Sequence, residues 1–476
     1  MIQSIVWPDP RMKEFRSPFQ RGDKERNLRL TLHIESFDGI TGENEVAYSV
    51  IRELGELTEI EIISTQEDSF PWMQIKDEPA KDGYKNVNVW QGGKILSYHH
   101  GVNPSRYDQE YIQWIIGYHS NNEIIKVAEN AILIAEAHHT LRRDILVTMS
   151  PLLLEHREKF KYSNIFSPIE AAKLVGLFLR TRDNWVYRKI DRTSLITDKS
   201  QFYWVLARSK LPAMWRYFLG CVHARKIHGD EIMFVGESIL ERCKRVLQAR
   251  DGIAEQFYKI QDTNTQDEIM YHFDYVALML VGVFDAQATI INYVYGLVKN
   301  NFDVGFRKPR FQEALQKSKA KDLFKLVTSD YCGHLMKMLH TIRNTIHNAG
   351  LSTFTLLKMP DPAISLITVP ETMQEELWQT SQVLGTPSEW GLIREEYMLF
   401  DSETKTQSPK TRISLEPYSY VTKLIDMWFD LFNQIAERTA IEDLFVGVEV
   451  PELINKPPDD WMLQIERFKI LGNNAC

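Results

Sequence analysis

The sequence predicts a mainly α fold made of helical bundles, with a smaller α+β region at the N-terminal end. Apolar and polar residues alternate with the strand period of two over the first hundred residues. From about residue 107 onward, apolar residues recur three and four positions apart, which is the spacing of a buried helical face. With 44% hydrophobic and 25% charged residues among 476, the chain is long and apolar enough for several globular domains, and wholesale disorder is excluded.

The N-terminal region, residues 1–103, is expected to contain a sheet. Alternating runs at 28–37, 58–64 and 86–91 predict strands. Glycine-containing turns separate these runs, so the pattern predicts an α+β region.

Residues 104–229 are expected to form a helical, basic middle region. Helical spacing covers 109–119, 123–146 and 169–182. Ser167 and Pro168 followed by Glu170 are a helix start signal, because Ser caps free amides and Pro fits the first turn.

Residues 230–440 are expected to form a helical bundle, and residues 441–476 a packed C-terminal extension. A β-hairpin is predicted at 353–369, turning at Met359–Pro362, as an insertion in this bundle. The helices expected from the periodicity are 230–250, 266–299, 310–327, 330–348, 373–384 and 416–438.

Common catalytic and metal-binding signatures are missing from the sequence. It has no Walker A, GxGxxG, GxSxG or HExxH motif, which removes the commoner nucleotide-binding, hydrolase and metalloprotease classes. The four cysteines form no CxxC pair. We therefore expect no metal and no cofactor.

The sequence also favours a cytoplasmic protein without a membrane span. Pro8 and Pro10 interrupt the start, where a signal peptide needs an unbroken apolar stretch. The longest apolar run, 275–298, carries Asp285, Gln287 and Asn292 near its middle. Polar side chains there are costly in a bilayer, so a buried helix of a soluble bundle is the better interpretation.

Charge is unevenly distributed along the chain, although the total is only −8. Residues 173–228 carry 12 basic and 3 acidic side chains, and residues 307–343 carry 9 and 3. The segment 361–476 carries 9 basic and 20 acidic side chains. Two basic blocks therefore lie between acidic segments.

The first basic block interleaves cations with aromatic residues between 202 and 226. Cations neutralise phosphates and aromatic faces stack bases, so this composition suits single-stranded nucleic acid. The alternative is that the aromatic residues are core and the cations meet the acidic C-terminal segment inside the protein. The candidate nucleic-acid-binding residues are Arg208, Lys210, Arg216, Arg225 and Lys226.

The second basic block ends in a helix expected over 328–350, with Thr328 or Ser329 as its cap. Leu335, Leu339, Ile342 and Ile346 share one face and predict the buried stripe. A second face carries His340, Arg343, Asn344 and His347, where Arg343 and His347 project from neighbouring turns.

Arg and His on one helical face are suited to cleaving a phosphodiester in RNA without a metal. A histidine can exchange protons with the 2′-hydroxyl or the leaving oxygen, and a guanidinium can hold the charge on the phosphorane. His347 lies in the last turn, where the helix dipole favours its protonated form. On spacing alone, the alternative is an ordinary surface helix with polar side chains.

The run Arg343-Asn344-Thr345-Ile346-His347 resembles the signature of the HEPN superfamily, which are all-helical RNA-processing and toxin-like domains. The resemblance covers roughly residues 230–440, where a long apolar helix carrying Asp285, a basic helix, the motif helix and a closing helix follow in similar order. In the family pattern, more residues separate Arg from His than the three found here.

The resemblance implies an RNA-directed protein, with a metal-independent endoribonuclease of the toxin or phage-defence type as the leading function. Arg343 would stabilise the phosphate, His347 would act as acid or base, and Asn344 would orient the site in a homodimer. Asp285 is either a satisfied core polar group or a partner for Arg343 or His347. The alternative function is a non-catalytic HEPN-like dimerisation or interaction protein.

Overall fold

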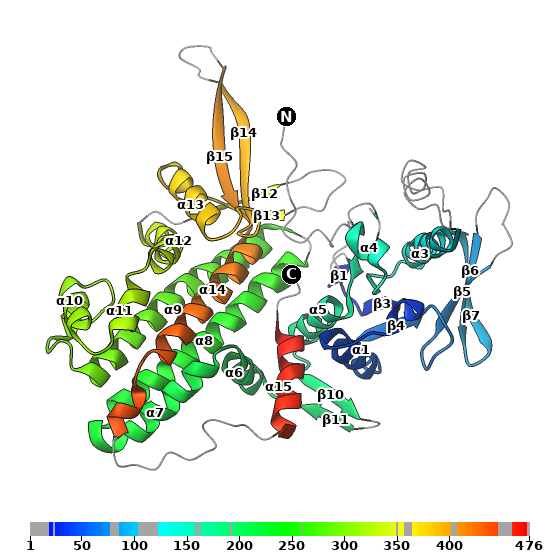
Figure 1. Ribbon diagram of the computed structural model, residues 1–476. Coiled ribbons are helices and arrows are strands. Elements are labelled where there is room, and N and C mark those ends of the chain that lie inside the picture. The colour runs from blue at the N-terminus through cyan, green and yellow to red at the C-terminus, as the bar shows by residue number, and fades with distance from the viewer. Residues whose placement is uncertain are drawn as a thin grey trace.

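A computed structural model describes the chain over residues 19–21, 24–76, 85–102, 122–157, 160, 163–190, 193–259, 261–348, 351–356, 364–400, 407–445 and 459–473. An α/β part built on a sheet lies beside a larger helical body (Figure 1). The expectation of a mainly α fold with a smaller α+β region is therefore confirmed.

The α/β part contains a seven-stranded sheet of order β7-β6-β5-β4-β3-β8-β9. Five neighbouring strands, from β5 to β9 in this order, run parallel, and β5, β6 and β7 are antiparallel. The strands are β3 (Leu28–Leu32), β4 (Ile60–Ser64), β5 (Trp72–Ile75), β6 (Lys85–Gln91), β7 (Lys94–Val102), β8 (Ile145–Val147) and β9 (Ile165–Phe166).

Helices cover both faces of this sheet because the central strands are apolar on both sides. Leu28, Leu30 and Leu32 of β3 share a core with α1 (Glu43–Leu54) and α5 (Pro168–Thr181). On the other face, α3 (Asn122–Thr140) packs on β6, β8 and β9 in a second core. The expected start signal of α5 is a full capping box between Ser167 and Glu170.

The sheet includes strands on both sides of residue 103, the expected boundary between the α+β region and the helical middle region. The helix expected over 123–146 ends at Thr140, and Ile145–Val147 pairs with β3 as β8. A three-residue apolar run carries no period of its own, and its pairing with β3, more than 100 residues away, and with β9 makes it a strand. The expected helical stretch 109–119 lies outside the described residues.

The helical body is organised around two long helices, α8 and α9, that pack against each other along their length, with α14 running along them (Figure 1). The expected helix 310–327 is divided into α10 and α11. The helices are α6 (Lys199–Lys210), α7 (Pro212–His228), α8 (Asp230–Phe257), α9 (Thr263–Tyr295), α10 (Pro309–Lys317), α11 (Lys321–Val327), α12 (Asp330–Asn348), α13 (Glu371–Val383) and α14 (Pro417–Glu437).

Among the described residues, α9 is the one helix long and apolar enough to cross a membrane, with 56% of its most apolar window buried. Phe284 of α9 packs edge-on against Trp428 of α14 at 5.3 Å between ring centroids. Gln287, one of its central polar residues, is buried and donates to the Phe432 carbonyl at 3.1 Å. The Asn292 side chain bonds to the backbone of Val298, whereas Asp285 is exposed.

The expected β-hairpin is present as β12 (Ser352–Leu356) and β13 (Ile364–Thr368), and its turn lies outside the described residues. A second hairpin, β14 (Leu392–Phe400) and β15 (Gln407–Leu415), joins it in a sheet of order β12-β13-β15-β14. The sequence analysis missed this hairpin because Arg394, Glu395 and Glu396 interrupt its apolar alternation.

A buried carboxylate joins the two parts of the protein. Asp251 of α8 accepts hydrogen bonds from Arg180 Nε of α5 (2.8 Å), Arg250 Nη2 (2.6 Å) and the Tyr203 hydroxyl of α6 (2.9 Å). Burial alone would raise the pKa of Asp251, but the two guanidiniums outweigh it and lower the pKa below its ordinary value.

The same two guanidiniums hold the C-terminal helix α15 (Asp459–Gly472). Arg250 Nη2 donates to the Gly472 carbonyl at 2.6 Å, and Arg180 donates to the Leu471 carbonyl. A Cβ at Gly176 of α5 would lie 2.3 Å from the Leu471 oxygen, so only glycine permits this close approach. The helix α15 therefore docks against α5 and α6, between the α/β part and the helical body (Figure 1).

We predict that Asp251→Asn lowers the free energy of unfolding by about 3–5 kcal/mol, because it leaves two buried guanidiniums without their counter-charge. Chemical denaturation followed by circular dichroism measures this change.

Asp426→Asn is the matched control. Its carboxylate is 51% exposed and pairs with Lys210 at 3.5 Å, so its loss should cost less than about 1 kcal/mol. Equal, small effects of the two substitutions would contradict a central role for Asp251.

Candidate functional site

The helix α12 carries the polar face that the sequence analysis singles out. Ser329 caps it, since its hydroxyl accepts from the Cys332 amide at 3.2 Å. Leu335, Leu339 and Ile342 are buried as expected, and the Ile346 side chain lies outside the described residues. The helix is thereby fixed against α9, α13 and α14, and Asn344 is exposed.

The structure places two of the three expected catalytic residues. Arg343 is half-buried, and its Nη1 donates to Oδ1 of the exposed Asn344 at 3.3 Å. His347 belongs to α12, but its side chain lies outside the described residues. The roles of Arg343 and Asn344, and the position of the His347 imidazole, stay predictions.

Asp285 lies on the solvent-facing side of α9, where positive charges on other elements influence its carboxyl. Partial burial raises the pKa of its carboxyl, and nearby positive charges act in the opposite direction. The interpretation of Asp285 as an electrostatic partner of Arg343 therefore has support. The cations close enough to lower this pKa are Arg242, Arg307, Lys308 and Arg343.

The four cations come from three separate parts of the chain. Arg242 of α8 lies across Gly282 of α9 and donates to its carbonyl at 2.6 Å. Arg307 and Lys308 belong to the exposed segment just before α10, and Arg343 belongs to α12. The helix packing, rather than the local sequence, brings these charges together.

His340 lies one turn before Arg343 on α12 and has a strongly shifted pKa. Burial, together with the positive charges of Arg307 and Arg343, lowers this pKa to about 4. Its Nε2 atom is buried and has no hydrogen-bond partner within the described part of the chain. At neutral pH this imidazole is uncharged and can accept a proton.

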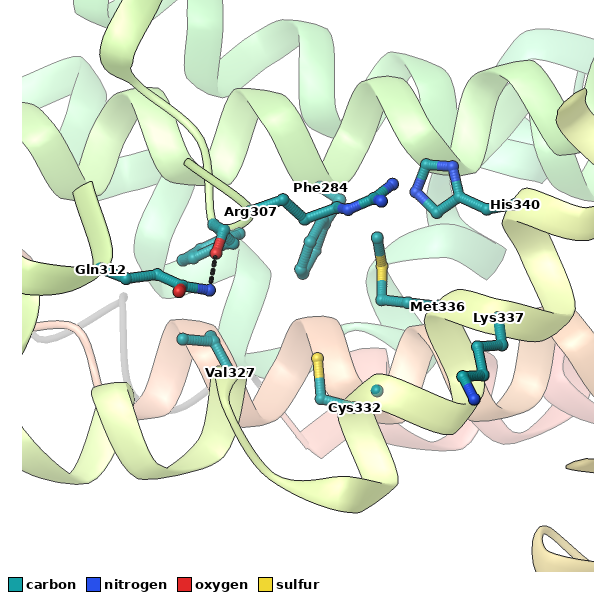
Figure 2. Close-up of a pocket in the computed structure, with 10 residues that line it drawn as sticks. Phe284, Arg307, Gln312, Val327, Cys332, Met336, Lys337 and His340 are labelled. Atoms are coloured by element: carbon teal, nitrogen blue, oxygen red, sulfur yellow. Dashed lines mark hydrogen bonds between the residues drawn. The ribbon is translucent and has the colours of Figure 1, made fainter. Parts of the chain in front are cut away.

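A pocket of about 270 Å³ opens beside these residues, between α9, α10, α11 and α12. Figure 2 shows Arg307 and His340 extending toward each other along one side of it. Phe284, Phe306, Arg307, Gln312, Val327, Cys332, Gly333, Met336, Lys337 and His340 line the pocket.

Two cations of the first basic block, Lys210 and Arg216, meet the acidic C-terminal segment. Lys210 lies 3.5 Å from Asp426, and Arg216 pairs with Glu442. These carboxylates neutralise the positive charges of Lys210 and Arg216, which would otherwise be available to a nucleic acid. Such pairing with the acidic C-terminal segment is what the alternative to nucleic-acid binding expects.

The other three cations of that block are placed differently. The guanidinium of Arg208 lies 4.1 Å from the ring centroid of Trp215. Arg225 pairs with Asp230 at 3.5 Å, and Lys226 is exposed. Three of the five predicted nucleic-acid-binding residues, Lys210, Arg216 and Arg225, thus pair with carboxylates of this chain.

A polar cluster that the sequence analysis missed lies at the carboxyl ends of β3 and β8. His33 Nδ1 is 2.9 Å from Thr148 Oγ1, and Ser36 Oγ accepts from the Met149 amide at 2.9 Å. Burial lowers the pKa of His33, although Glu35 opposes this. These groups satisfy one another across two loops and hold the loops together.

No group of three His, Cys, Asp or Glu side chains that could hold a metal ion occurs within the ranges that the structure describes. Comparison with protein-family models, with curated proteins and with solved structures gave no match to this chain. The function therefore has to be inferred from the geometry and charge of the α12 face.

We predict that His340→Asn makes the protein less sensitive to acid. Between about pH 6.5 and about pH 4, His340 is protonated in the unfolded chain but stays neutral in the folded protein. The free energy of unfolding of the wild-type protein therefore falls as the pH falls. After allowance for solvent screening, the variant should gain about 1 kcal/mol relative to wild type on going from neutral pH to about pH 5.

Denaturation at the two pH values measures this difference, and Met336→Leu, a neighbouring change without a titratable group, is the control. Equal pH dependence of the wild-type protein and His340→Asn would show that folding does not shift the pKa of this imidazole.

Proposed function

We propose that this protein is RNA-directed and that the α12 face around Arg343 is a metal-independent endoribonuclease site of the toxin or phage-defence type. The observation that carries this proposal is the concentration of charge. Four cations act electrostatically on the single carboxylate of Asp285, on a face with an open pocket. A phosphate backbone is the ligand that such a face attracts.

In this proposal His340, whose pKa is lowered, is the base, and His347 is the acid. His340 is a weak base because its pKa is about 4, but it is uncharged at neutral pH and so would accept the proton of the 2′-hydroxyl as that oxygen attacks the phosphorus. In the last turn of α12, where the helix dipole favours the protonated form, His347 would give a proton to the leaving 5′-oxygen. Arg343 lies between them along the helix and would stabilise the phosphorane.

An exposed apolar stripe on α9 supports a homodimer. Tyr271 and Leu278 are 66% and 38% exposed and stand seven residues apart, on one side of the helix. A further step of seven residues reaches Asp285. A second copy that covered this stripe would therefore approach the α12 site and enclose it.

The alternative is a non-catalytic interaction protein. It is favoured by the pairing of Lys210 and Arg216 with the acidic C-terminal segment, which uses charge for internal docking. In that case the α12 face would bind an acidic partner without chemistry.

We predict that the wild-type protein cleaves single-stranded RNA in the presence of EDTA and leaves a 2′,3′-cyclic phosphate. Arg343→Ala and His347→Ala should each slow cleavage about 100-fold or more, because each removes a group that acts in the transition state. Gel analysis of end-labelled RNA and mass spectrometry of the products measure both effects.

Arg438→Ala is the matched control, since Arg438 is exposed at the C-terminal end of α14 and donates to the Gln434 carbonyl. A strict requirement for magnesium would contradict the mechanism. Absence of RNA binding even at low salt would favour the interaction protein, because phosphate contacts are strongest there.

A further inference from the structure

The pocket beside α12 combines an apolar wall with a charged rim. Phe284 and Phe306 lie with their ring centroids 4.5 Å apart, and Val327 and Met336 extend the apolar surface. Figure 2 shows the Met336 side chain directed toward the space beside Phe284. Such a wall favours a flat ring, because aromatic and thioether groups pack against ring faces.

The rim adds positive charge and one unsatisfied nitrogen. Arg307 is exposed and lines the pocket, and its charge is close enough to lower the pKa of His340. His340 Nε2 is buried without a hydrogen-bond partner among the described residues. A buried nitrogen in this state is costly unless a ligand supplies the missing bond. A ligand with both a ring and an anion fits this combination.

The volume of the pocket restricts the size of that ligand. At about 270 Å³ it lies just below the range of roughly 300–1,000 Å³ that is usual for drug-sized ligands. One nucleobase fits this space, whereas a folded peptide segment or a dinucleotide does not.

We infer that this pocket binds a single unstacked nucleobase of RNA, with the phosphate on its 3′ side held between Arg307 and Arg343. This inference rests on the proposed function and extends it to substrate selection. His340 lies on the rim, so a nucleotide seated here presents its 2′-hydroxyl to the neutral imidazole. The base in the pocket is thus the one on the 5′ side of the cleaved bond, and the pocket wall selects it.

Binding of nucleoside 3′-monophosphates to the full-length protein tests this inference. Calorimetry should show that at least one of the four common 3′-monophosphates binds about tenfold or more tightly than inorganic phosphate, because stacking adds to the charge interaction. Arg307→Ala should weaken the binding of both the nucleotide and inorganic phosphate. Filling the pocket should weaken the binding of the nucleotide alone.

Two substitutions fill the pocket. A Cβ at Gly333 meets nothing within 4 Å, and its φ is ordinary for a helix, so Gly333→Phe can place a ring at the pocket without strain. Met336→Trp fills the wall from the next turn. Each should reduce nucleotide affinity about tenfold and leave phosphate affinity unchanged. Val127→Phe, at a 66% exposed position on α3, controls for an added aromatic ring, and circular dichroism checks each fold.

The outcomes separate this inference from the ribonuclease proposal. Nucleotides that bind no more tightly than phosphate, or that bind equally well to both filled variants, would overturn the pocket assignment even if RNA is cleaved. Tight nucleotide binding that the filled variants lose would support the assignment, even if Arg343→Ala and His347→Ala show that no cleavage takes place.

Discussion

The fold depends on the buried carboxylate of Asp251. A charge without water needs opposite charge and hydrogen bonds, and Asp251 receives both from Arg180 and Arg250. Because Arg180 belongs to α5 of the α/β part and Asp251 to α8 of the helical body, this contact fixes the orientation of one part on the other. Arg180 Nη1 and Arg250 Nη2 also donate to carbonyls at the end of α15, so the C-terminal helix stabilises the same junction.

The packing of α8 and α9 positions the α12 face. The helix α8 carries Arg242 across α9 to the neighbourhood of Asp285, and α9 in turn supports α12 with Arg343. The acidic C-terminal segment pairs with Lys210 and Arg216 of the first basic block. The cations around Asp285 outnumber the one carboxylate among them, and they keep their attraction for a phosphate.

Several features of local origin could be predicted from the sequence, whereas the hairpin β14–β15 and the features that depend on distant partners could not. The capping box at Ser167, the cap of α12 and the hairpin before α13 depend on neighbouring residues, and each is present. The strand β8 and the Asp251 cluster depend on partners far along the chain. For the site, the face with Arg343 and Asn344 was predictable. The convergence of Arg242 and Arg307 on it, and the altered pKa of His340, require the packing of α8, α9 and α12.

The central claim is that RNA lies on the α12 face beside the pocket. Photo-crosslinking of single-stranded RNA carrying 4-thiouridine, followed by mass spectrometry of the joined peptides, tests it most directly. The account predicts that crosslinks fall in the segment from Phe306 to Arg343, where the pocket wall and the cations meet. Crosslinks confined to residues 203–226, or to the seven-stranded sheet, would contradict it.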